Sequence, residues 1–133
     1  MAYQWVKDFF TAADSLDVER FCAALPRDIV WRFANFPTAR GIGELRVQYE
    51  MVAQILESMR HEIVGIWDAG DCVTAETRVF YVDVHGREFD CPGCDVFLLR
   101  DGALAEVRIF VDNHVLFTPP TGTEPAVLGE GVA

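Results

Sequence analysis

Two aspartates in the second half of the chain lie in otherwise apolar segments, where a carboxyl group could do acid–base chemistry. Asp112 follows Val111 at the end of an apolar run, and Asp95 shares one face of a predicted strand with Phe97 and Leu99. Burial among such neighbours disfavours the charged form and raises the pKa of a carboxyl group toward neutrality. One such group can take a proton next to a carbonyl, and another can stay protonated and donate a hydrogen bond to the developing oxyanion. We consider Asp112 for the first role and Asp95 for the second.

Both aspartates also have a structural interpretation. Alternation with Ile109 and Val111 places the Asp112 side chain on the opposite face of the strand, where it could cap backbone amides. A bulge or strand end would be needed to turn Asp112 inward. Asp95 could pair with an arginine such as Arg78. The sequence leaves these alternatives open.

Other polar and aromatic side chains could complete a ligand site. Glu76, Arg78 and Phe80 share one face of a predicted strand, and a Glu76–Arg78 pair in a pocket could bind a polar group or neutralise itself. Aromatic rings could stack on a flat ligand, although such spacings are also typical of a core. The residues predicted to bind a ligand are Trp31, Phe33, Asn35, Tyr49, Glu76, Phe80, Phe97 and Asn113.

The cysteines and histidines receive no catalytic role. Cys91-Pro-Gly-Cys94 has the spacing of a redox motif, but it leads into a predicted strand rather than a helix whose N-terminus would activate the thiol. No second ligand pair is spaced for zinc, so no metal site is predicted. His61 begins a strand and His85 lies in a turn, and both are interpreted as solvated or capping residues; His114 is kept as a reserve candidate.

Composition indicates one ordinary domain. The 133 residues are 51% hydrophobic and 24% charged, which is typical of a chain with a single core. The formal net charge of −10 argues against nucleic acid and anionic membranes, because both would repel the protein. We expect a cytoplasmic protein, because the N-terminus lacks the pattern of a signal peptide and no apolar segment approaches membrane-spanning length.

Apolar periodicity predicts helices in the first half of the chain and strands in the second. The expected helices cover 3–13, 18–25 and 44–59, and the expected strands cover 29–33, 61–67, 72–84, 88–100 and 104–111. Glycine lies between successive long strands, and Asp101-Gly102 is among the stronger short hairpin signals, so these strands are expected to be antiparallel. One domain is predicted over 1–117, followed by a mobile tail, 118–133, rich in Pro, Gly, Thr and Glu.

This order of elements resembles a known fold. A helical hairpin, a short strand, a long helix opened by Arg40-Gly-Ile-Gly-Glu-Leu and an antiparallel meander are similar to the nuclear transport factor 2-like fold, in particular its SnoaL-like polyketide cyclase and ketosteroid isomerase group. The strongest local signature is the strand, Asp-Gly turn and strand from Phe97 to Asp112. The resemblance implies an α+β fold in which a cone-shaped, mixed or antiparallel curved sheet packs against three N-terminal helices, as in a cystatin-like roll.

The ketosteroid isomerase site carries over only in part. In that enzyme a tyrosine and a protonated aspartic acid form the oxyanion hole, while a second aspartate moves the proton. Here Phe9 falls at the tyrosine position and Arg32 near the base position, and only Asp95 matches, as the protonated acid. The steroid isomerase mechanism is therefore disfavoured.

Two other relatives imply different site residues. Limonene epoxide hydrolases use an arginine and two aspartates around a water, and this chain keeps Arg78 but has Phe80 and Ile109 at the acid positions. SnoaL-like cyclases use as base an aspartate that resembles Asp112. The resemblance also implies that Glu76, Arg78 and Phe80 face the concave side of the sheet.

We therefore expect a pocket protein that binds a hydrophobic carbonyl compound, polyketide-like or steroid-like. It would isomerise, cyclise or dehydrate this compound through Asp112, with Asp95 or Arg78 steadying the enolate. No cofactor is required, because enolisation needs only a base and an oxyanion partner. The alternative is a noncatalytic module for ligand binding or dimerisation. Both hypotheses expect a homodimer through the outer face of the sheet.

Overall fold

Helices and a short hairpin occupy the first half of the chain, and long strands occupy the second. The structure is a computed structural model and describes residues 3–120. In chain order the elements are α1 (Gln4–Asp14), α2 (Val18–Ala23), β1 (Val30–Phe33), β2 (Ala39–Arg40), α3 (Ile42–Gln54), β3 (Leu56–Asp68), β4 (Cys72–Asp83), β5 (Glu88–Arg100), β6 (Ala103–Val111) and the 3-10 helix η1 (His114–Phe117).

The first two helices form where the residue pattern predicts them. Phe9, Phe10 and Ala13 recur at helical spacing and are buried on one face of α1, which contacts β3. At the start of α2, the Asp17 side chain accepts a hydrogen bond of 3.0 Å from the backbone N–H of Arg20. This bond caps the N-terminus of α2.

Helix α3 ends earlier than the sequence predicts. The expected helix extends to Met59, but the chain leaves the helix at Gln54 and Leu56 already begins β3. Pairing with β4 sets Leu56 opposite Asp83 and Met59 opposite Tyr81. The helix propensity of these residues is a small bias, and strand pairing overrides it. As a result, Met59 lies on the sheet.

The strands form one mixed sheet in the order β2-β1-β6-β5-β4-β3. Strands β3 to β6 are antiparallel neighbours, β1 and β2 form an antiparallel pair, and β1 runs parallel to β6. At the β5–β6 turn, Asp101 and Gly102 both have positive φ, 52° and 80°, as a two-residue type I′ hairpin requires. This turn confirms the hairpin predicted from the Asp-Gly pair.

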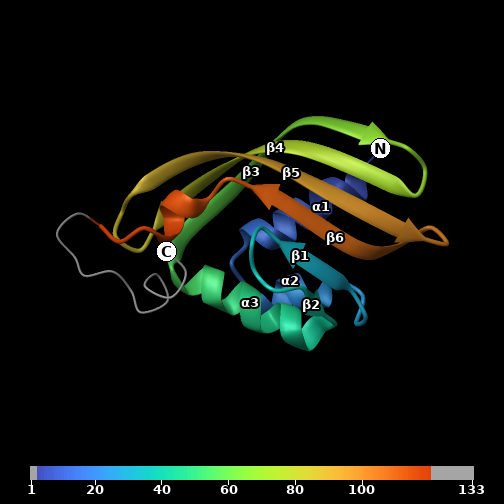
Figure 1. The fold of residues 1–133 in the computed structure, drawn as a ribbon, viewed down its shortest axis with the longest axis horizontal. Coiled ribbons are helices and arrows are strands. Elements are labelled where there is room, and N and C mark those ends of the chain that lie inside the picture. Colours follow the sequence, from blue (N-terminus) through green and yellow to red (C-terminus); the bar gives the residue numbers. More distant parts are fainter. Residues whose placement is uncertain (1–2, 121–133) are drawn as a thin grey trace.

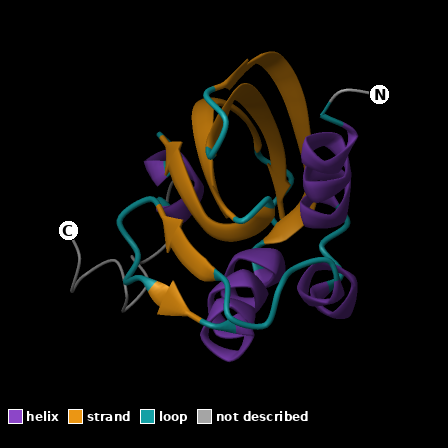
Figure 2. Ribbon diagram, turned by 90° about the vertical axis from the view of Figure 1, so that its right-hand side faces the viewer, coloured by secondary structure: helices purple, strands orange, loops and turns teal. Residues whose placement is uncertain are grey.

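The sheet curls over the helices without closing. Figure 1 shows the long strands bending across the molecule, with α1, α2 and α3 on the inner side of the bend. Figure 2 shows the strands end-on, curving around an interior that the helices border. Strands β2 and β3 are the two free edges. The predicted α+β architecture, a curved sheet on three N-terminal helices, is confirmed.

Two further sequence predictions concern the C-terminal tail and the cellular location. From residue 121 on, the predicted tail lies outside the described residues. Within residues 3–120, no helix is long and apolar enough to span a membrane. The cytoplasmic location stays a prediction.

Candidate active site

A cavity lies between the concave face of the sheet and the helices. It encloses about 650 Å³ of empty space, including the space at its open mouth. Its wall is mostly apolar and comes from α1, α2, α3 and five of the strands. The aromatic lining residues are Phe9, Phe21, Trp31, Phe33, Tyr49 and Tyr81, and the other polar ones are Gln48, His61 and Asp95.

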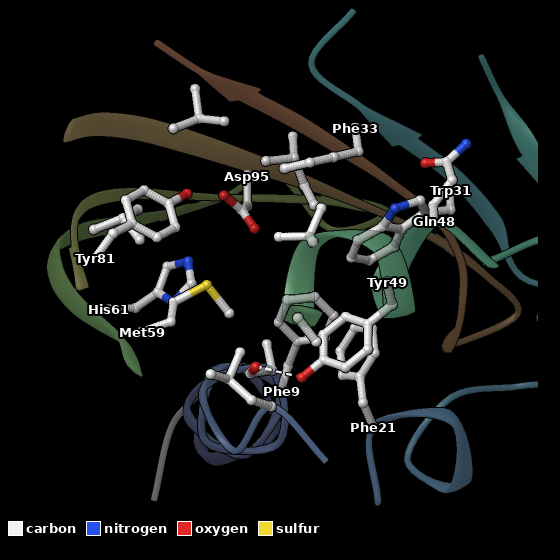
Figure 3. A pocket seen from close by; sticks show the side chains of 17 residues that line it. Phe9, Phe21, Trp31, Phe33, Gln48, Tyr49, Met59, His61, Tyr81 and Asp95 are labelled. Atoms are coloured by element: carbon white, nitrogen blue, oxygen red, sulfur yellow. Dashed lines mark hydrogen bonds between the residues drawn. The ribbon is translucent and has the colours of Figure 1, made fainter. Parts of the chain in front are cut away.

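Asp95 is the acid of this cavity. Its carboxyl group points inward from β5 (Figure 3), and the residue is only 2% exposed. Its partners across the neighbouring strands are Ala75 and Ile109, both apolar. Burial raises the pKa of Asp95 from 3.8 to about 7; nearby His61 opposes this rise, and Asp14 adds to it. The carboxyl group is therefore substantially protonated near neutral pH.

The alternative interpretation of Asp95, an ion pair with Arg78, is wrong. Arg78 instead contacts Asp90, with 2.7 Å between Nη2 and Oδ1. Within residues 3–120, no arginine or lysine forms an ion pair with Asp95. Asp95 is thus surrounded mainly by apolar atoms and has no cationic side chain as an ion-pair partner among residues 3–120. This is the environment that the sequence predicts for a neutral acid.

His61 and Asp14 form a fixed pair next to Asp95. The Asp14 carboxylate lies 2.5 Å from His61 Nδ1 and also accepts the His61 backbone N–H at 2.8 Å. The imidazole stacks on Phe10 with 4.6 Å between the ring centres. Because the carboxylate accepts at Nδ1, a proton belongs on Nδ1, and in the neutral imidazole the lone pair is on Nε2. Figure 3 shows the ring beside the cavity, with one nitrogen on the side that faces Asp95.

Tyr81 completes the polar end of the cavity. Its hydroxyl points toward the Asp95 carboxyl group in Figure 3 and lies beside the side chain of Asn113. Burial raises the pKa of this phenol, so it stays protonated. Asn113 is itself 5% exposed and does not line the cavity. The polar end therefore gathers Asp95, His61 and Tyr81 from three adjacent strands.

The prediction that Asp112 opens into the cavity is wrong. Its side chain is 72% exposed and lies 2.9 Å from Nδ1 of His114, which is also exposed. β6 pairs with β5 without a bulge near its end, so the inward direction of Val111 turns the next residue outward. The carboxyl group of Asp112 therefore lies at the surface, outside the cavity.

The prediction that Glu76, Arg78 and Phe80 face the concave side of the sheet is also wrong. Thr77, Val79 and Tyr81 are buried on the concave side, whereas Glu76, Arg78 and Phe80 lie on the outer side. Phe80 is covered there by the guanidinium of Arg60, 4.3 Å from the ring centre. Both faces of β4 carry apolar residues, so a period of two could not choose between them.

Of the remaining residues predicted to bind a ligand, some line the cavity and others do not. Trp31, Phe33 and Tyr49 line the cavity as predicted, whereas Asn35 is exposed on the loop after β1 and does not. Phe97 is fully buried beneath the wall, with its ring centre 5.0 Å from that of Phe9. Three of the predicted aromatic residues thus line the cavity, and their contact with a ligand stays a prediction.

Sequence reasoning missed His61, Asp14 and Tyr81. The signal for His61 was present, because alternation places it on the same face as Met59 and Ile63, and both pack against the core. Asp14 ends α1, and only the contact of α1 with β3 brings it to His61. That contact joins residues 47 positions apart, which local patterns do not report.

The cysteines stay outside this chemistry. Cys22, Cys72, Cys91 and Cys94 are free thiols. Burial raises the pKa of Cys91 and of Cys94, which lowers the thiolate fraction on which reactivity depends. No group of three or more metal-binding side chains gathers within residues 3–120.

Comparison with known proteins identifies the family. Residues 6–107 match the SnoaL-like domain. The chain belongs to this family. No curated protein matches the SnoaL-like chain.

Solved structures share the fold at low sequence identity. A protein from Jannaschia sp. CCS1 named for the SnoaL-like polyketide cyclases is 16% identical, with a TM-score of 0.75 over 91% of this chain and 92% of that one. An LEH-like epoxide hydrolase from M. tuberculosis is 22% identical, with a TM-score of 0.68 over 87% of this chain and 86% of that one. TerC, crystallised with polyporic acid, is 15% identical, with a TM-score of 0.73 over 84% and 92%. These likenesses confirm the nuclear transport factor 2-like fold of the SnoaL-like chain.

Proposed function

We propose that this SnoaL-like domain binds a small, mostly apolar carbonyl compound and moves a proton next to the carbonyl group. The observation that carries this proposal is the buried Asp95 carboxyl group, which has a pKa of about 7 and faces an apolar cavity beside the His61–Asp14 pair. Strongly shifted acids in a cleft are candidates for catalysis. Isomerisation, cyclisation and dehydration all begin with this proton transfer.

The two groups have complementary roles. His61 Nε2 takes a proton from the carbon next to the carbonyl, and the electrons of that C–H bond move toward the carbonyl oxygen. The Asp95 O–H donates a hydrogen bond to this oxygen as negative charge develops there. Asp14 holds the imidazole in position and stabilises its charged form. The role assigned to Asp112 from the sequence passes to His61 in this mechanism.

The wall of the cavity suits such a substrate. Trp31, Phe33 and Tyr49 offer ring faces on which a planar compound can stack. The co-crystallisation of TerC with polyporic acid supports a small organic ligand in this fold. Hydrolysis of an epoxide by an arginine and two aspartates is not supported, because Arg78 lies on the outer face and Ile109 occupies an acid position.

Deuterium uptake by a model ketone tests the proposal. β-Tetralone, a two-ring ketone, is incubated with the protein in heavy water, and mass spectrometry follows deuterium at the carbons beside the carbonyl. The protein should accelerate uptake well above the buffer rate. Binding without acceleration would instead support the noncatalytic module.

Asp112→Asn should leave this exchange rate unchanged, within about twofold of the wild-type protein. Its carboxyl group is exposed and outside the cavity, so it contacts no bound ligand. Exchange kinetics of the purified variant provide the measurement. A loss of tenfold or more would restore Asp112 as a candidate base.

A homodimer through the outer sheet face is also part of the proposal. Val64, Trp67 and Phe110 are large, more than half exposed, and lie on strands of this sheet. Apolar patches of this kind are typical of protein contacts. Phe110→Glu should convert a dimer to a monomer in light scattering, whereas Val84→Glu, at an exposed position beside the β4–β5 turn, should not. A monomeric wild-type protein would contradict the dimer.

A further inference from the structure

Gln48 provides an unused hydrogen-bond acceptor in the wall of the cavity. It lies on α3, where Gln48, Tyr49, Val52 and Ala53 form the helix face that lines the cavity. Its Oε1 atom is buried and has no hydrogen-bond partner among the described residues. Buried polar atoms in native proteins are nearly always paired, so an exception in a cavity wall points to a ligand or water.

The orientation of this amide follows from its other contact. Gln48 Nε2 donates to the backbone carbonyl oxygen of Pro37 at 2.5 Å. A carbonyl oxygen can only accept, so the NH₂ group must face Pro37 and the oxygen must take the opposite side. In Figure 3 the oxygen lies on the side of Gln48 nearer the cavity. The loop at Pro37 thus fixes Oε1 as an acceptor beside the ligand space.

Gln48 lies far from the acid–base groups. Figure 3 shows Gln48 and Trp31 at one end of the cavity, and His61 and Tyr81 at the other, with Asp95 between them and nearer to His61. Resting on the proposed function, we infer that the ligand carries a hydrogen-bond donor that pairs with Gln48 Oε1 while its carbonyl group meets Asp95. The substrate class is then a hydroxylated cyclic or aromatic ketone.

The energetic reason is the cost of an unpaired acceptor. An apolar ligand that fills this end displaces any water from Oε1 and leaves the oxygen unsatisfied. A ligand hydroxyl restores the lost hydrogen bond. The expected preference is about tenfold in Kd for a well-placed hydroxyl over hydrogen. Gln48 would therefore act in specificity and not in proton transfer.

Binding of matched ketones tests this inference. The dissociation constants of β-tetralone and its phenolic isomers, which carry one hydroxyl at different ring positions, are measured by calorimetry. At least one isomer should bind the wild-type protein about tenfold more tightly than β-tetralone. Gln48→Leu should abolish this preference, mainly because the phenolic isomer binds this variant more weakly. Gln48→Met should have the same effect. The control Gln54→Leu, at an exposed position of the same helix, should retain it.

The outcomes separate the two proposals. Equal binding of all the ketones to the wild-type protein, or a preference that survives in both Gln48 variants, overturns the role of Gln48 and leaves the proposed function intact. Failure of every ketone to bind overturns both.

Discussion

Asp95→Asn should increase the free energy of unfolding by about 2 kcal/mol more at pH 8 than at pH 5.5. In the folded protein the Asp95 carboxyl group keeps its proton up to about pH 7, whereas its ordinary pKa is 3.8. Folding therefore takes up a proton between these values, and the wild-type protein loses stability as the pH rises through this window. Asparagine does not titrate, so the variant lacks this loss.

Urea unfolding of both proteins at the two pH values measures the difference. Any constant effect of the amide on packing cancels, because only the change with pH is compared. Asp112→Asn, which alters an exposed carboxyl group, should show a difference near zero. A pH-independent effect of Asp95→Asn would mean that Asp95 ionises like a surface aspartate.

His61→Gln and Asp95→Leu should each slow deuterium exchange of β-tetralone by about a hundredfold or more. The first removes the proposed base, and the second removes the hydrogen-bond donor to the enolate oxygen; single groups of these kinds contribute about 10²- to 10⁴-fold. In the wild-type protein the rate should also fall as the pH rises through about 7, because Asp95 then loses its proton.

Exchange kinetics between pH 5.5 and 8.5 provide this measurement. His85→Gln replaces an exposed turn histidine and should retain the wild-type rate. A rate that instead rises through pH 7 and vanishes in Asp95→Asn would make Asp95 the base. Retention of full activity in His61→Gln would remove His61 from the mechanism.

The fold was predictable because its signals are local. The Asp101-Gly102 turn, the Asp17 cap and the apolar face of α1 each depend on residues close in sequence. The end of α3 was not predictable in this way. Residues 55–59 suit a helix, and only the pairing of β3 with β4 makes most of them a strand.

The site was predictable where side-chain surroundings lie within one strand. Asp95 sits among apolar neighbours on β5, so its raised pKa follows from the sequence. The sequence does not show which face of β4 lines the cavity, because Phe80 and Tyr81 are both aromatic and point to opposite faces of the sheet. His61 becomes significant only through Asp14, and this contact exists only after the sheet curls over α1.

A carbon-13 NMR titration of the Asp95 side-chain carboxyl group tests most directly whether the cavity holds a neutral acid. Its resonance is assigned by its absence from the spectrum of Asp95→Asn. The carboxyl group should titrate near pH 7, well above the ordinary pKa of 3.8 for an aspartate. Titration near pH 4 would contradict a protonated Asp95 at neutral pH and, with it, the proposed hydrogen bond to the enolate.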